Sequence, residues 1–360
     1  MLRRNWSVPM RLEDPQVLSK QDPAGMLTLI ERFPQMCAEA WDLGWAVQMQ
    51  AAKPNAIVAL GMGGSGIGGD LLRAILFDEA TAPVIPVKEY RAPAFAGRGT
   101  LVFACSYSGN TEETLAAYDE ARQRGATCVA VTSGGELLRL AKERGDAAAI
   151  VPGGLPPRAA LPYLFIPMLA VLGRAGLLRS LAGELRENVD VLSGIVASER
   201  PDGRSGAASR IAQRVAGRIP VIYSATPFLE PAAERWKDQF NENSKTFAVW
   251  NTFSELNHNE TVGWGMDDAL ARSIHVIILR DATESPRLSQ RVAITKELAF
   301  ARAGGLDEVR AQGQGKLARL LSTILVGDFV SWYLATLRGV DPTPVKVIDE
   351  LKRRLSEGDQ

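Results

Sequence analysis

Acidic side chains recur at every fourth position in the stretch PFLEPAAERWKDQFNENSK, residues 227–245, which we predict to be helical. The acids of this row are Glu230, Glu234, Asp238 and Glu242. Like charges at this spacing destabilise an isolated helix by roughly 0.2–0.5 kcal/mol per pair. For the first three acids we expect a solvated face, with the charge relieved by Arg235, Lys237 and Lys245. Glu242 differs, because it lies between two asparagines where the helix gives way to a strand, and we predict acid–base chemistry for it.

A second candidate group is His258, which lies in the stretch ELNHNETVGW at residues 255–264. We expect a loop there, and loops carried on a rigid scaffold often hold functional side chains. The other histidine, His275, stands in the apolar run SIHVIIL and is predicted to be packed in a strand. Two histidines make a histidine-rich zinc site hard to build, so we expect no metal site. The cysteines are too scattered for a disulfide framework and are predicted to be small core residues: Cys37, Cys105 and Cys128.

A glycine-rich turn follows an apolar run in NAIVALGMGGSGIGGD, residues 55–70. A strand, a glycine turn and a helix start place several backbone N–H groups at the positive end of a helix dipole, where anions bind. Gly64 and Ser65 lie in this turn. The spacing GxGxxG also fits a dinucleotide fold. From this loop alone a nucleotide, another phosphate and a merely tight turn all remain open.

The next loop favours a phosphate over a dinucleotide. The stretch SYSGNTEET, residues 106–114, brings three hydroxyl groups together before a predicted helix: Ser106, Ser108 and Thr111. Thr111 alone is explained as a helix cap, but a cap needs only one hydroxyl. Several O–H and N–H donors at a helix start suit a terminal phosphate, whose three oxygens accept many hydrogen bonds. A sugar phosphate therefore fits these loops better than NAD.

The elements that must position these groups follow from the alternation of apolar runs and amphipathic stretches. Runs predicted as buried strands lie at residues 56–60, 84–88, 101–105, 127–132, 147–151, 219–224, 246–250, 274–280 and 307–311. Helices fit between them, which implies parallel sheets covered on both faces. We therefore predict an α/β fold with two tandem units. The predicted divisions are a helical segment at 1–50, domains at 51–197 and 206–342, and a C-terminal helix at 343–360.

Composition limits the classes of partner. The chain has 360 residues, long enough for two domains, and its 41 lysines and arginines balance 41 aspartates and glutamates. No overall field therefore recruits nucleic acid or an acidic membrane. Apolar runs such as residues 274–279 are far shorter than the roughly 20 residues that cross a bilayer. The start of the chain has no apolar signal region, so we expect a cytoplasmic protein without a membrane partner.

Together the glycine loop and the SYSGNTEET loop resemble the sugar isomerase (SIS) domain, in which the serine/threonine loop holds the phosphate of a phosphosugar. The motifs ERWKDQFNENSK and ELNHNE, the segment PPRAAL and the ending GVDPTPV extend the likeness over nearly the whole chain. The sequence is similar to the bifunctional phosphoglucose/phosphomannose isomerase family. This resemblance implies two SIS domains, each a flavodoxin- or Rossmann-like three-layer αβα unit.

The resemblance also implies roles for single residues. Interconversion of an aldose and a ketose 6-phosphate removes a proton from C2 and returns it to C1 through a cis-enediol, so a carboxylate base is required, and we expect Glu242 to serve. His258 would assist ring opening in the partner subunit's site, which implies a homodimer. Arg158 would face the enediolate, unless it forms only an interdomain ion pair. Lys352, ahead of Lys346, would be the family's C-terminal lysine, unless it lies on a solvated helix face.

Two further expectations complete this assignment. Thr343 would be the small threonine to which the family's dual glucose and mannose activity is attributed. The expected substrate is a hexose 6-phosphate, and the reaction needs no cofactor. A non-catalytic SIS-type regulator, an NAD-dependent dehydrogenase and an amino-sugar isomerase are the alternatives. Regulators of this type usually carry a DNA-binding domain, and residues 1–50 have neither a basic patch nor a clear helix-turn-helix pattern.

Overall fold

The computed structural model describes residues 20–49, 53–179, 181–201 and 206–358. Residues 1–19 of the predicted N-terminal helical segment and residues 359–360 of the predicted C-terminal segment lie outside this part. Residues 20–49 contain helices α2 (Met26–Glu31) and α3 (Phe33–Trp45), as the helical prediction requires.

The first sheet has five parallel strands in the order β2-β1-β3-β4-β5. These strands are β1 (Ala56–Leu60), β2 (Val84–Val87), β3 (Thr100–Cys105), β4 (Thr127–Thr132) and β5 (Ala147–Ile150). Every residue of β1 and β3 is buried, which explains why these strands are apolar along their whole length. Pro86 is confined to the edge strand β2, where a missing N–H costs no central ladder hydrogen bond.

The second sheet has four parallel strands in the order β7-β6-β8-β9. These strands are β6 (Ile219–Ser224), β7 (Val249–Thr252), β8 (Ile274–Arg280) and β9 (Gly305–Arg310). The predicted position of β7, residues 246–250, is three residues too early at its start. The chain first makes a turn, in which Lys245 has a φ of +51° and the Thr246 N–H donates to the Phe240 carbonyl at 2.9 Å.

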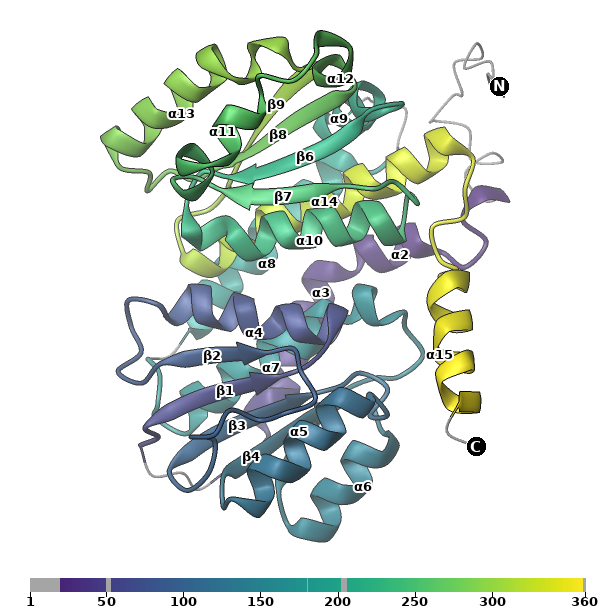
Figure 1. Cartoon of the computed structure of the whole chain (residues 1–360). Coiled ribbons are helices and arrows are strands. Elements are labelled where there is room, and N and C mark those ends of the chain that lie inside the picture. Colours follow the sequence, from purple (N-terminus) through teal and green to yellow (C-terminus); the bar gives the residue numbers. More distant parts are fainter. Residues whose placement is uncertain (1–19, 50–52, 180, 202–205, 359–360) are drawn as a thin grey trace.

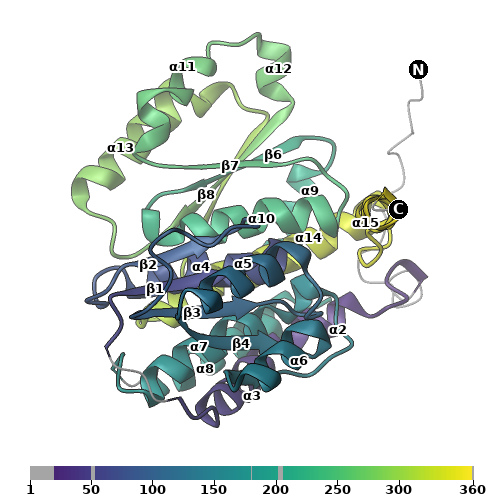
Figure 2. The ribbon, with the colours of Figure 1, turned by 60° about the horizontal axis from the view of Figure 1, so that its bottom comes forward.

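Helices cover both sheets and fill the space between them (Figures 1 and 2). On the outer faces lie α5 (Glu112–Gln123), α6 (Gly135–Arg144), α11 (Glu260–Gly263), α12 (Asp268–Arg272) and α13 (Pro286–Leu298). Between the sheets lie α3, α4 (Gly63–Leu76), α7 (Leu161–Arg174), α8 (Ala182–Glu199), α9 (Ala207–Val215), α10 (Glu230–Glu242) and α14 (Lys316–Arg338). One continuous apolar core runs through this middle layer and touches both sheets, while each outer face has a core of its own. The predicted α/β fold with two helix-flanked parallel sheets is confirmed.

The longest helix, α14, lies at the centre of this arrangement. With 23 residues it spans about 35 Å, and it packs against α8, α9 and α10. By length and composition it is the one helix of the described residues that would suffice to cross a membrane, but 94% of its apolar window is buried inside the protein. Its apolar character is therefore explained by the protein core.

The remaining short elements carry several candidate residues. They are the 3₁₀ turns η1 (Pro157–Ala160), η2 (Pro227–Leu229), η3 (Glu255–His258) and η4 (Phe300–Arg302), followed by the exposed C-terminal helix α15 (Lys346–Gly358). His275 is fully buried with its Nε2 atom 2.8 Å from Asp307 Oδ2, which confirms a packed strand histidine. All three cysteines are buried and unpaired, as predicted.

The acidic row on α10 does not form the solvated face that we expected. Its first acids instead meet cations of the first domain: Glu230 lies 3.4 Å from Arg73, and Glu234 lies 2.7 Å from Lys88. Asp238 does pair with Lys237, at 2.6 Å. The repulsion along the row is thus relieved largely across the domain interface, which a periodicity within one helix cannot reveal.

The strand order places both candidate phosphate loops at one position. In the order 2-1-3-4-5 the chain reverses its direction of winding between β1 and β3, and ligands of such sheets bind at the carboxyl ends of the strands there. The glycine turn follows β1 and the SYSGNTEET loop follows β3. These two loops are therefore neighbours at the switch point of the first sheet.

Candidate active site at the end of helix α10

Arg158 connects the first domain with the end of α10. Its side chain is 4% exposed and lies in η1. The guanidinium donates to Asn243 Oδ1 at 2.7 Å, to the carbonyls of Pro342 and Thr343 at 2.7 Å each, and to Glu242 Oε2 at 3.3 Å. Burial lowers the pKa of Arg158, and the neighbouring carboxylates oppose this. A cation fixed by this many acceptors forms a rigid part of the site.

Glu242 is the last residue of α10, and its side chain is 28% exposed. Burial raises the pKa of this carboxyl group above its ordinary value, while the Arg158 charge lowers it and the Asp238 charge raises it. A general base works best when its pKa approaches the working pH, so burial moves Glu242 in the useful direction. Arg158 contacts the Glu242 carboxylate, which also faces the pocket.

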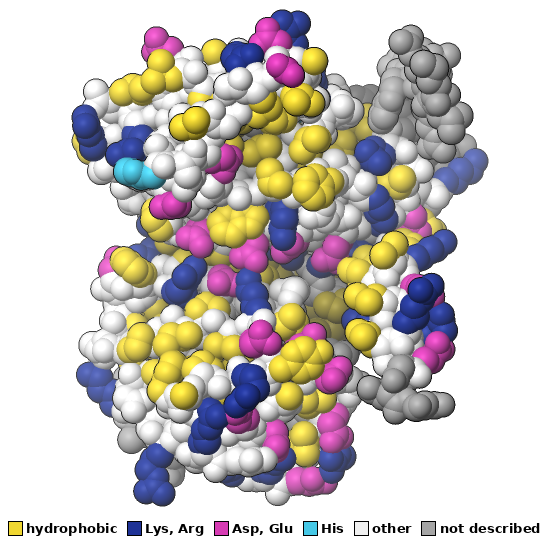
Figure 3. All heavy atoms as spheres, viewed as in Figure 1, with side chains coloured by type: hydrophobic (Ala, Val, Ile, Leu, Met, Phe, Trp, Pro, Cys, Tyr) yellow, Lys and Arg dark blue, Asp and Glu magenta, His cyan; other side chains and the backbone are white. Residues whose placement is uncertain are grey.

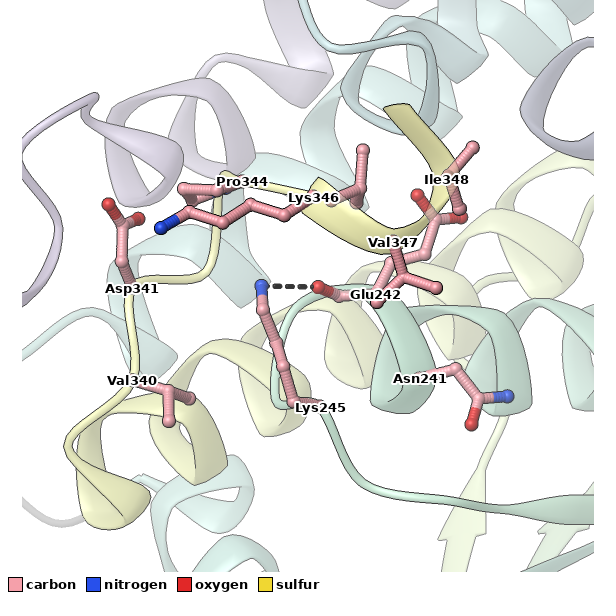
Figure 4. Close-up of a pocket in the computed structure, with 10 residues that line it drawn as sticks. Asn241, Glu242, Lys245, Val340, Asp341, Pro344, Lys346, Val347 and Ile348 are labelled. Carbon is pink, nitrogen blue, oxygen red and sulfur yellow. Dashed lines mark hydrogen bonds between the residues drawn. The ribbon is translucent and has the colours of Figure 1, made fainter. Parts of the chain in front are cut away.

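Lys245 adds a second cation next to Glu242. It is the one residue other than glycine with positive φ in the described part of the chain. Its ammonium donates to the Glu242 carbonyl at 2.7 Å, drawn as a dashed line in Figure 4, and to the Pro342 carbonyl at 3.0 Å. Partial desolvation and the charge of Arg158 lower its pKa to about 8. Arg158 and Lys245 therefore both donate to the carbonyl oxygen of Pro342.

A pocket of about 570 Å³ opens beside Glu242 (Figure 4). Its walls come from α10, the turn after it, the turn before α15 and the start of α15. The residues that line it are Asn241, Glu242, Lys245, Val340, Asp341, Pro344, Val345, Lys346, Val347 and Ile348. Lys346 thus faces this pocket, whereas Lys352, further along α15, is exposed and does not line it.

The hydroxyl groups of the phosphate loops lie close together. Ser106 Oγ is 2.8 Å from Thr111 Oγ1, and Ser65 Oγ accepts the Tyr107 N–H at 3.2 Å. Thr111 stands at the N-cap position of α5, yet its side chain makes no capping hydrogen bond. The exposed Ser108 accepts the Asn110 N–H at 3.2 Å. Ser106 Oγ also accepts the Thr111 N–H at 3.4 Å, and both hydroxyl groups lie at the start of α5, where an anion is favoured.

Gly64 joins the phosphate loops to Arg158. A methyl group on Gly64 would lie 3.1 Å from the carbonyl carbon of Pro157 and 3.2 Å from the Cα atom of Arg158. The glycine turn therefore packs directly on η1, because it has no side chain at this point. A continuous path runs from Ser65 in this turn through Arg158 to Glu242. The structure brings these three predicted residues into one region between the domains.

His258 lies elsewhere in the same chain. It ends η3, is exposed, and follows β7 at the carboxyl end of the second sheet. Glu242 ends α10, which returns antiparallel to the strands and therefore reaches the amino end of the same sheet (Figure 1). Since α10 has 13 residues, about 20 Å long, Glu242 and His258 lie at opposite ends of one domain.

Thr343 contributes to the site through two different atoms. Its carbonyl oxygen accepts from Arg158, as described above. Its hydroxyl oxygen, Oγ1, is buried and has no hydrogen-bond partner among the described residues. A buried hydroxyl without a partner costs free energy, and Thr343 Oγ1 is one of several such atoms in the described residues, Thr114 Oγ1 among them.

The residues that sequence reasoning missed are Lys245, named only as a neutralising charge, and the backbone of Pro342. A turn that requires positive φ at a lysine has no clear sequence signal. The carbonyl of Pro342 is found only from the tertiary structure. Among the described residues, no cluster of three His, Cys, Asp or Glu side chains is placed to hold a metal ion.

Two parallel helix-flanked sheets, with hydroxyl loops at the switch point of the first, define a protein with two SIS domains. The SIS domain family matches residues 51–148, and the bacterial phospho-glucose isomerase C-terminal SIS domain matches residues 204–355. A solved structure of the C-terminal domain of glucosamine-fructose-6-phosphate aminotransferase from Francisella tularensis superposes with a TM-score of 0.67 at 17% identity. It covers 89% of this chain and 98% of its own, and at that identity it shows the fold alone.

Relatives of known name identify the family. The bifunctional phosphoglucose/phosphomannose isomerase of Caldicellulosiruptor bescii is 40% identical over 92% of this chain and 99% of its own length. The enzyme of the same name from Aquifex aeolicus is 38% identical over 84% of this chain and 90% of its own. The chain belongs to the bifunctional phosphoglucose/phosphomannose isomerase family, an enzyme family, as its motifs predicted.

Proposed function

We propose that this protein interconverts glucose 6-phosphate and fructose 6-phosphate, and also mannose 6-phosphate and fructose 6-phosphate. The names of its relatives support the substrate class. The observation that carries the proposal is the contact between Arg158 and Glu242 beside an open pocket, because this pair suits the chemistry of aldose–ketose isomerisation.

In the proposed mechanism Glu242 removes the proton from C2 of the open-chain sugar and delivers it to C1 through a cis-enediol. The raised pKa of Glu242 supports both steps, because the group must take the proton and then return it. The enediolate carries negative charge, and the guanidinium of Arg158 is the preorganised cation that stabilises it. No metal or other cofactor takes part in these steps.

The phosphate of the substrate is proposed to bind at the switch point of the first sheet. Ser65, Ser106, Ser108 and Thr111 supply hydroxyl donors, and the start of α4 at Gly64 supplies backbone N–H groups. The packing of Gly64 against Arg158 fixes the distance from the phosphate site to the catalytic groups. A substrate held at its phosphate end then presents its C1 and C2 atoms to Glu242.

We further propose that His258 completes the site of a second subunit in a homodimer, where it assists ring opening. The separation of His258 from Glu242 within one chain supports this arrangement. Exposed apolar side chains also support a contact between subunits: Phe247 and Val249 are 70% and 39% exposed beside α10 and β7, where Figure 3 shows hydrophobic side chains at the surface.

Two residues near the C-terminus are proposed to contact the sugar. Thr343 would satisfy its buried hydroxyl with a sugar hydroxyl, and a small side chain there leaves room for both epimers at C2. For the C-terminal lysine we proposed Lys352 ahead of Lys346. The position of Lys346 in the pocket wall supports Lys346 instead.

The direct test is an assay of purified protein with glucose 6-phosphate or mannose 6-phosphate in the presence of a chelator. We expect fructose 6-phosphate from both. Binding of either sugar phosphate without turnover would contradict the proposal and favour a non-catalytic SIS regulator. A product that forms only with NAD would support the dehydrogenase alternative. A product that forms only with an ammonia donor would support the amino-sugar isomerase.

A further inference from the structure

A second row of polar side chains on α10 and its C-cap residue lies one residue after each of the last three acids of the acidic row. Its members, spaced four residues apart, are Arg235, Gln239 and Asn243. All three are almost fully buried, and their polar atoms meet α14. Buried polar groups at this spacing are unusual on a helix between two apolar layers, so their partners require an explanation.

An ion pair anchors the row. Arg235 and Asp328 are 2% and 3% exposed, and Arg235 Nη2 lies 3.0 Å from Asp328 Oδ2. The same nitrogen donates to the carbonyl oxygen of Arg158 at 2.7 Å, while Gln239 Nε2 donates to Asp328 Oδ1 at 2.8 Å. This pair therefore fixes the main chain of Arg158 relative to α10 and α14.

The side chain of Arg158 is oriented through a different route. Ser331 Oγ donates to the Asp328 carbonyl at 2.8 Å, so its lone pairs accept the Asn243 Nδ2 group at 3.0 Å. The Asn243 amide is thereby held with its Oδ1 atom toward Arg158 Nε, at 2.7 Å. An amide turned the other way would set its N–H against the Arg158 Nε–H and its carbonyl oxygen against the lone pairs of Ser331 Oγ.

We propose that Ser331 and Asn243 are positioning residues, which hold the guanidinium of Arg158 in the plane that reaches Glu242. Neither touches the pocket, and both act through Arg158. This inference rests on the proposed function, in which the contact between Arg158 and Glu242 supports proton transfer. It assigns a catalytic purpose to a polar network that stability alone does not require, since apolar groups of similar shape would fill the same space.

The charged groups around Glu242 determine what misplacement of Arg158 should do. These groups are Arg158 from η1, Asp238, Arg235 and Lys245 from α10 and the turn after it, and Asp341 and Lys346 from the pocket wall. The charge of Arg158 lowers the pKa of Glu242. If Arg158 moves away, the pKa of Glu242 rises, and the acid limb of kcat/KM moves to higher pH.

The test compares two buried serines of α14. In Ser331→Ala the orienting hydroxyl of the network is lost. The matched control is Ser322→Ala, because Ser322 Oγ likewise donates to the carbonyl three residues earlier, at 2.9 Å, and accepts one N–H, from Gln312 at 2.8 Å. Each variant loses one bond donated to a main-chain carbonyl and one bond accepted from an N–H group, which is the Asn243 side chain for Ser331 and the Gln312 main chain for Ser322. Their thermal stabilities should therefore fall by similar amounts.

We expect Ser331→Ala to lower kcat about 10- to 100-fold with little change in KM, and to move the acid limb to higher pH. Ser322→Ala should keep the kcat and the pH profile of the wild type. Asn243→Asp serves as a second variant, because its carboxylate neutralises Arg158 and should move the acid limb in the same direction. A Ser331→Ala variant that behaves like Ser322→Ala would overturn the proposal.

A readout without turnover separates this inference from the proposed function. The pKa of the Glu242 carboxyl is measured by carbon-13 NMR titration in the absence of substrate, with the resonance assigned by Glu242→Gln. A higher pKa in Ser331→Ala than in Ser322→Ala supports the positioning role, even if the protein acts on another substrate. Equal pKa values would reject the positioning role, even if the isomerase activity is present.

Discussion

Arg158 Nη1 lies 3.3 Å from Glu242 Oε2, although the two residues are 84 positions apart in the chain. Nε of the guanidinium donates to Asn243 and Nη2 donates to two main-chain carbonyls, so these contacts hold Arg158 in place if the Glu242 carboxylate moves. The sequence left open whether Arg158 is a catalytic cation or an interdomain ion pair. The geometry makes these two alternatives compatible, because one interdomain contact sets the charge next to the proposed base.

The acid limb of the activity should report on this contact. The proposed base Glu242 must be a carboxylate, so we expect activity to be lost as the pH falls through its pKa, which burial raises above the ordinary value. Since the Arg158 charge lowers that pKa, Arg158→Gln should move the acid limb to higher pH and reduce kcat by about 10²–10³. The measurement is the pH dependence of kcat/KM. Arg73→Gln, which removes an arginine from the far end of the acidic row, is the control. If the acid limb of Arg158→Gln is unchanged, the charge of Arg158 does not set the pKa of the base.

The alkaline limb should depend on Lys245. Its ammonium holds the Glu242 and Pro342 carbonyls, and its pKa is lowered to about 8. We therefore expect kcat/KM to fall as the pH rises above about 8. Lys245→Arg keeps the charge at all accessible pH values and should move this limb upward. Lys237→Arg, on α10 itself and paired with Asp238, should not move it. If Lys245→Arg does not move the alkaline limb, that limb arises from another group.

The phosphate loops should affect binding more than turnover. Thr111→Val keeps the shape of the side chain but removes the hydroxyl that lies 2.8 Å from Ser106 Oγ. Loss of one hydrogen bond to a charged phosphate should raise KM about 10- to 100-fold, with a smaller change in kcat. Thr114→Val is the matched control, since that buried hydroxyl has no partner among the described residues. If the two variants have equal KM values, the phosphate of the substrate does not bind at the Thr111 hydroxyl.

The proposed exchange of His258 between subunits predicts complementation. Glu242→Gln and His258→Ala should each be nearly inactive as pure homodimers. Unfolding and refolding the two together produces mixed dimers, in which one site has both wild-type residues. Random pairing should then restore about a quarter of the wild-type activity. If the mixture stays as inactive as its components, His258 does not act from the partner subunit.

The sequence predicted the sheets well, because their strands are apolar runs with clear ends. It misplaced β7, since the turn at Lys245 depends on a positive φ, which a lysine in the sequence does not indicate. It also predicted a solvated acidic face on α10, because periodicity identifies a polar face but not its partner. The cation that meets Glu234 is Lys88, which lies 146 positions earlier.

The candidate site was predictable to a similar degree. Glu242, Arg158 and the hydroxyl loops follow from motifs, since their residue types reflect the chemistry directly. The network of Arg235, Asp328 and Ser331 does not, because each of these residues could equally lie at a surface until the packing of α10 on α14 is known. A row of buried polar residues at four-residue spacing is the signal that, in hindsight, points to it.

The central claim is that the Glu242 carboxylate moves hydrogen between C1 and C2, and exchange with solvent tests it most directly. Wild-type protein in deuterium oxide should incorporate deuterium at C2 of glucose 6-phosphate, as followed by proton NMR. Glu242→Gln should slow this incorporation by about 10²–10⁴ while folding normally. Glu230→Gln, from the same acidic row, should stay within a few-fold of the wild type. If Glu242→Gln exchanges hydrogen at the wild-type rate, Glu242 is not the base.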